Sequence, residues 1–136
     1  MTYIRGEMPK QTKLALIVAK PGHLWDGVQS LLRTLPEISI IAEIKCPTVL
    51  LRMHSELKPD LILLDASLFG EDIWKSITKI NEEWSNARCV VLVEDCQHHQ
   101  ALYDAGADLV VAQGFPATKL VAAIEELLSA NSEGEQ

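Results

Sequence analysis

The chain has 136 residues, of which 48% are hydrophobic and 23% charged, and its net charge is -7. This length suits one domain with its own core, and the composition excludes a wholly disordered chain. The acidic balance argues against direct nucleic-acid binding, which needs a basic surface. The three cysteines are widely spaced and the longest apolar runs are short. We therefore expect a cytoplasmic protein with no disulfide framework and no membrane segment.

Short apolar runs alternate with amphipathic stretches along the whole chain. The runs predict five strands, over residues 14–19, 38–44, 61–65, 89–93 and 108–112. Most runs are continuously apolar, which is typical of parallel strands that are covered on both faces.

Helical spacing of apolar residues predicts a helix after each of these strands. The five helices are expected over residues 24–32, 49–57, 74–81, 96–105 and 120–128, with Gly106 capping the fourth. Five βα units in a row predict an α/β, three-layer, doubly wound (βα)5 domain. We expect a flexible lead-in over residues 1–13, the domain over 14–128 and a flexible tail over 129–136.

Asp65 ends the third predicted strand, LILLD, and so lies at the carboxyl edge of the sheet. Ligands bind and chemistry occurs at this edge in open α/β sheets. The surrounding segment PDLILLDASLFGEDIW resembles the phosphoacceptor strand and following loop of response-regulator receiver domains. The segments LIVAKPGHLWDGVQSLL, ARCVVLV and ALYDAGADLVVAQGFPATKLVAAIEELL resemble other parts of the same CheY-like family, in the same order.

This resemblance covers residues 14–128 and implies a flavodoxin-like fold with parallel strand order 2-1-3-4-5. It also implies a role in two-component signal transduction. In this family two acids after the first strand hold Mg²⁺ together with the phosphoacceptor aspartate. A Ser or Thr ends the fourth strand, a Lys ends the fifth, and an aromatic residue on the fifth reports phosphorylation. Together these groups stabilise charge during phosphoryl transfer.

Only the phosphoacceptor position, Asp65, matches the family pattern. The acidic pair falls on Ala19 and Lys20, the hydroxyl on Val93, the lysine on Gln113 and the aromatic on Val110. The charges of Asp65 and Lys20 sum to about zero, so a dication gains little by binding. We hypothesise that Lys20 occupies the space of the metal and pairs with Asp65, and we expect no metal and no cofactor.

The degenerate site predicts a pseudo-receiver, that is, a phosphorylation-independent protein-interaction module and not an enzyme. The alternative is a phosphorelay receiver that a histidine kinase phosphorylates on Asp65, and Mg²⁺ would then be required. The expected partner is another signalling protein or that kinase. A homodimer through the C-terminal helix region is a further expectation, because its apolar residues cover more than one side of the helix. These are Leu120, Val121, Ala123, Ile124, Leu127 and Leu128.

Other candidate groups are interpreted as surface features. Glu94 and Asp95 follow the fourth strand and could supply metal oxygens, but a solvated loop is preferred. Cys96, His98 and His99 could bind a softer metal, but no second cluster supports such a site. Trp25 is interpreted as partly exposed. No nucleophile–base pair or phosphate-binding glycine loop is present in the sequence.

Overall fold

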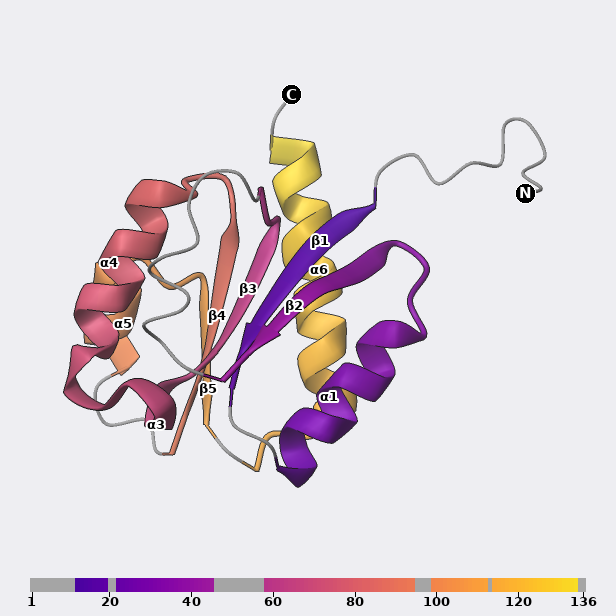
Figure 1. Cartoon of the computed structure of the whole chain (residues 1–136). Helices are drawn as coiled ribbons and strands as arrows, with labels where there is room; N and C mark the ends of the chain where they lie inside the picture. The colour runs from indigo at the N-terminus through magenta and orange to yellow at the C-terminus, as the bar shows by residue number, and fades with distance from the viewer. Residues whose placement is uncertain (1–11, 20–21, 46–57, 95–98, 113, 135–136) are drawn as a thin grey trace.

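The computed structural model describes residues 12–19, 22–45, 58–94, 99–112 and 114–134. A five-stranded parallel sheet forms the centre of this part of the chain (Figure 1). Its strands are β1 (Lys13–Val18), β2 (Ile38–Ile44), β3 (Leu61–Asp65), β4 (Arg88–Val93) and β5 (Leu109–Ala112). They lie in the order β2-β1-β3-β4-β5, which confirms the predicted fold and strand order.

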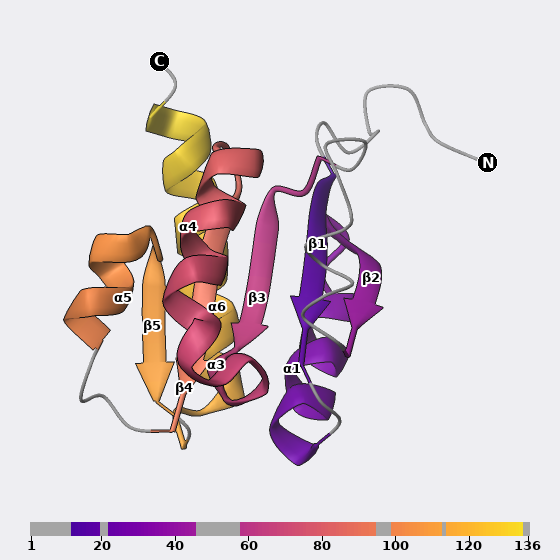
Figure 2. The ribbon, with the colours of Figure 1, turned by 60° about the vertical axis from the view of Figure 1, so that its left-hand side comes forward.

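Helices cover both faces of the sheet. They are α1 (His23–Arg33), α3 (Ala66–Phe69), α4 (Ile73–Glu83), α5 (His99–Ala105) and α6 (Ala117–Gly134), with a 3-10 turn η1 (Gly70–Asp72). Helices α1 and α6 pack side by side on one face, while α4 and α5 lie on the other (Figures 1 and 2). The helix predicted over residues 49–57 lies outside the described residues. None of the described helices is both long and apolar enough to cross a membrane.

Helix α6 continues past Leu128 to Gly134, into the segment expected to be a tail. No proline or glycine interrupts residues 117–133, so nothing in this sequence stops the helix before that glycine. The predicted cap at Gly106 is confirmed, because this residue follows α5 with a φ of 127°.

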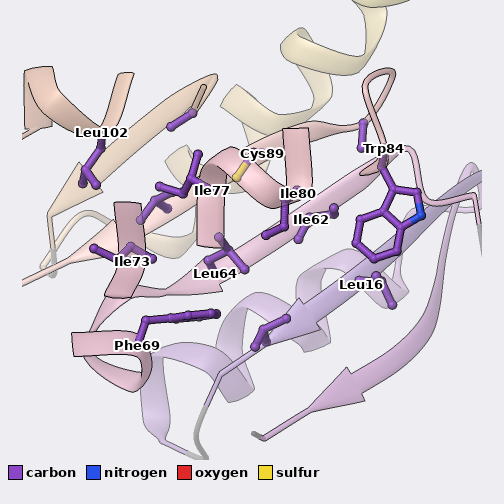
Figure 3. Packing of buried hydrophobic residues seen from close by; sticks show 14 of the residues in the cluster. Leu16, Ile62, Leu64, Phe69, Ile73, Ile77, Ile80, Trp84, Cys89 and Leu102 are labelled. Carbon is purple, nitrogen blue, oxygen red and sulfur yellow. The ribbon is translucent and has the colours of Figure 1, made fainter. Parts of the chain in front are cut away.

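The core consists of two layers separated by the sheet. Leu16, Val18, Ile62 and Leu64 face α4 and α5, whereas Ala15, Ile17, Leu61 and Leu63 face α1 and α6. Figure 3 shows the first layer, where Phe69, Ile73 and Ile77 pack toward the strands. Burial on both faces explains why β1 and β3 are continuously apolar in sequence.

Two aspartates bind backbone groups at the amino-terminal end of the sheet. Asp60 Oδ2 accepts a hydrogen bond from the Leu14 amide at 2.9 Å. Asp108 accepts from the Cys89 amide at 2.8 Å and from Arg88 Nη1 at 3.1 Å. Burial raises the pKa of the Cys89 thiol to about 12, and the negative charge of Asp108 acts in the same direction. This thiol is therefore kept protonated and unreactive.

Candidate functional site

Asp65 is the last residue of β3 and only 4% of it is exposed. Its backbone is extended, and the short helix α3 begins at the next residue. Its carboxylate caps this helix, because Oδ1 accepts hydrogen bonds from the Ser67 amide at 3.1 Å and from Ser67 Oγ at 2.7 Å. Aspartate is a preferred residue for this capping position, so the local sequence Asp65-Ala66-Ser67 favours the arrangement.

Trp25 supplies a third hydrogen bond to the same carboxylate. Its indole Nε1 donates to Asp65 Oδ2 at 3.2 Å, and the contact is buried. The interpretation of Trp25 as partly exposed is therefore wrong, since the residue is 5% exposed and packs in the core layer with Val28 and Leu32. The reason is topological: β1 pairs with β3, and α1 starts shortly after β1 at the edge where Asp65 lies.

Both oxygens of the Asp65 carboxylate are thus engaged by protein donors. Two bonds come from Ser67 on the α4 side of the sheet and one from Trp25 in α1. Hydrogen bonds to a charged group contribute about 1.5–3 kcal/mol each, so this network holds the carboxylate in one position. Sequence reasoning did not identify Trp25 or Ser67 as partners of Asp65. Two features of the sequence could have indicated these partners. They are the helix-capping pattern at Asp65 and the position of Trp25 in the first turn of α1, the helix that follows β1.

Three other expected pocket positions lie within the described residues. Ala19 is buried beyond the end of β1, and its amide donates to the Ile44 carbonyl at 3.0 Å. Val93 ends β4 and packs in the layer beneath α4 and α5. Val110 is half-buried on β5, and its amide donates to the Tyr103 hydroxyl at 3.0 Å. None of these three side chains carries an oxygen or a charge.

The other two expected positions, Lys20 and Gln113, lie outside the described residues. The pairing of Lys20 with Asp65 therefore stays a prediction. It would add a fourth donor to the carboxylate, beside the three that Trp25 and Ser67 supply.

The remaining candidates do not form a metal site in the described part of the chain. Glu94 is exposed after β4, and Asp95, Cys96 and His98 lie outside the described residues. His99 is exposed on α5, with its ring edge-on to Tyr103 at a centroid distance of 6.1 Å. No group of three or more His, Cys, Asp or Glu residues that could hold a metal ion occurs among the described residues.

A parallel sheet in the order β2-β1-β3-β4-β5, with a buried aspartate at the end of β3, is the architecture of response-regulator receiver domains. Comparison with solved structures confirms this resemblance. A two-component response regulator of the LuxR family from an Aurantimonas species gives a TM-score of 0.74 at 22% identity, covering 89% of this chain and 87% of that chain. The response regulatory domain of protein mrkE from Klebsiella pneumoniae gives 0.77 at 15% identity, covering 88% and 98%.

The response regulator domain of Thermotoga maritima CheB gives a TM-score of 0.73 at 14% identity, covering 88% of this chain and 98% of that one. Identities this low show the CheY-like fold alone. In sequence, the chain is 29% identical over 103 residues to response regulator protein VraR of Staphylococcus saprophyticus. That match covers 74% of this chain and 49% of VraR, so the chain spans about half the length of that relative. No protein-family model matches the sequence.

Proposed function

We propose that the chain is a pseudo-receiver of a two-component signalling system, which binds a cytoplasmic protein partner without being phosphorylated. The observation that carries this proposal is the state of Asp65. Its two carboxylate oxygens accept three hydrogen bonds from Trp25 and Ser67, and the residue is 4% exposed. A carboxylate held in this way stabilises one conformation of the domain.

Phosphorylation would have to disrupt this network. A phosphoryl group on Oδ2 would displace the indole N–H of Trp25, and one on Oδ1 would displace the Ser67 bonds that begin α3. Each lost charge-assisted bond costs about 1.5–3 kcal/mol. The valine at position 93 offers no hydroxyl that could bind a phosphoryl oxygen in return.

The donor set around Asp65 also does not fit Mg²⁺. This ion requires several oxygen ligands in near-ideal octahedral geometry. Ala19 supplies no side-chain oxygen, and both Asp65 oxygens already accept hydrogen bonds. We therefore propose neither a resident metal nor catalytic chemistry for this chain.

The second candidate function is a phosphorelay receiver that a histidine kinase phosphorylates on Asp65. The observation in its favour is that Asp65 ends β3 at the carboxyl edge of a receiver fold. The two functions are separated by incubating the chain with acetyl phosphate and Mg²⁺ and recording its intact mass. An active receiver with a complete acidic pair serves as the positive control, and Asp65→Asn as the negative control.

The pseudo-receiver proposal expects no adduct under conditions in which the positive control is phosphorylated. A species heavier by about 80 Da that is absent in Asp65→Asn would refute the pseudo-receiver proposal and support the phosphorelay function.

Helix α6 lies in the C-terminal region through which a homodimer is expected. Leu120, Val121, Ile124 and Leu128 are buried within the chain, while Leu127 is half-buried. The wide apolar stripe of this helix is thus largely used by the core of the domain. We propose a different protein as the principal partner, and light scattering of the purified chain distinguishes a monomer from a homodimer.

A further inference from the structure

A cavity of about 380 Å³ lies beside the Asp65 network, between α3, α4, α5 and the end of β4. Five apolar side chains line it: Ala66, Ile73, Trp74, Val93 and Leu102. Three polar residues complete the lining: Ser67, Glu94 and His99. Pockets that bind small molecules have volumes of about 300–1,000 Å³ and combine apolar walls with a few polar groups.

The apolar part of the cavity would hold the body of a ligand. Ile73, Val93 and Leu102 are each buried in the core layer beneath α4 and α5, and Figure 3 shows Ile73 and Leu102 within it. Receiver domains carry a hydroxyl at the position of Val93, by the resemblance described above. Here the side chain at this position is the hydrocarbon of Val93, which favours an apolar or aromatic group over a phosphoryl group.

The charge of the residues that line the cavity indicates which polar group the ligand would carry. Glu94 is an exposed acid, and no lysine or arginine lines the cavity among the described residues. A carboxylate at the rim attracts a cation and repels an anion.

We propose that this cavity binds a small aromatic compound that carries a protonated amine. The aromatic body lies against Ile73, Val93 and Leu102, and the ammonium group lies at the rim near Glu94. The occupant also contacts Ser67, whose amide and hydroxyl donate to Asp65. Occupancy therefore acts directly on the network that fixes the carboxylate. The site exists whether or not Asp65 accepts a phosphoryl group, so it goes beyond the proposed function and does not depend on it.

The test uses three indole probes of similar size that differ in charge: tryptamine, the neutral 3-ethylindole and the anionic indole-3-acetate. Each is titrated into the ¹⁵N-labelled chain at pH 8 while amide shifts are recorded. Tryptamine is expected to bind with a Kd on the order of 1 mM, as is usual for a fragment of this size. The shifts should map to the residues that line the cavity, and indole-3-acetate should bind least.

Two variants and a control identify the site. Glu94→Gln changes an exposed residue and should fold normally; it should weaken tryptamine about threefold to fivefold, as expected for an exposed ion pair, and leave 3-ethylindole unchanged. Glu126→Gln removes the same charge from an exposed position on α6, across the sheet, and should change neither affinity. Ala66→Leu fills the cavity and should abolish binding of both probes, with circular dichroism confirming its fold.

Two results would overturn the proposal. The first is the absence of shifts at the cavity residues with tryptamine at about 10 mM, ten times the expected Kd. The second is a Glu94→Gln variant that binds tryptamine as tightly as the Glu126→Gln control.

Discussion

The hydrogen bond from Trp25 to Asp65 can be measured by a double-mutant cycle. Trp25→Phe keeps an aromatic ring in the core but removes the indole N–H that donates to Oδ2 at 3.2 Å. Asp65→Ala removes the acceptor. The cycle subtracts the packing that each substitution changes by itself, so the remaining coupling energy belongs to the contact between the two side chains.

We expect a coupling energy of about 1.5–2 kcal/mol, because the contact is buried and its acceptor is charged. Trp25→Phe alone should lower the free energy of unfolding by about 2–4 kcal/mol, since the smaller ring also leaves a cavity beside Val28 and Leu32. Asp65→Ala should cost about 2–3 kcal/mol, less than the sum of the three bonds that it removes, because it also removes the desolvation cost of a buried carboxylate.

Urea denaturation followed by circular dichroism gives the four free energies of unfolding, provided that the m-value stays constant. The matched control is the same cycle with Trp84→Phe in place of Trp25→Phe. Trp84 is also buried, but it follows α4 and packs in the other core layer, so its coupling to Asp65 should be close to zero. A coupling for Trp25 below about 0.5 kcal/mol, or no larger than the control, would refute the stabilising role of this bond.

Three further predictions concern the rest of the fold. Because the pKa of the Cys89 thiol is raised from 9.0 to about 12, the unfolded chain loses this proton first as the pH rises. Between pH 8 and 10 the free energy of unfolding should fall by about 1 kcal/mol more than in Cys89→Ala, and equal slopes in urea denaturation would contradict this. Tyr103→Phe removes the acceptor of the Val110 amide and should cost about 1 kcal/mol while speeding hydrogen exchange at that amide; an unchanged exchange rate would exclude the bond. Gly106→Ala forces an L side chain to a φ of 127°, with its Cβ 3.0 Å from Asn81, and should lower stability by about 1–3 kcal/mol. Adding Asn81→Ala should restore only the steric part of this loss, and full recovery in thermal melts would show that the backbone is not strained.

The fold could be predicted because β1, β3 and β4 are buried on both faces. Continuous apolar runs then mark each strand to within about a residue, as for Lys13–Val18 against the predicted 14–19. The strand order came with the resemblance and not from periodicity. The C-terminal end of α6 was missed because a polar helix end such as residues 129–134 gives no apolar repeat.

The position of Asp65 could be predicted, but its surroundings could not. A carboxylate at the end of a buried strand is a local feature, and the acids and hydroxyl absent from its neighbourhood can be read from the sequence. The donor from Trp25 is 40 residues away in the chain. It depends on how α1 crosses the edge of the sheet, and the spacing of apolar residues along α1 indicates only that the helix is amphipathic.

The Asp65 network also affects how the two helical layers unfold. The sheet separates them, yet Trp25 belongs to the layer of α1 and α6, while Ser67 belongs to the short helix that precedes α4. Because one carboxylate binds both residues, neither layer can detach without leaving a buried charge with fewer partners. We therefore expect both layers to unfold as one cooperative unit. In Asp65→Ala, native-state hydrogen exchange should give different opening free energies for the two layers.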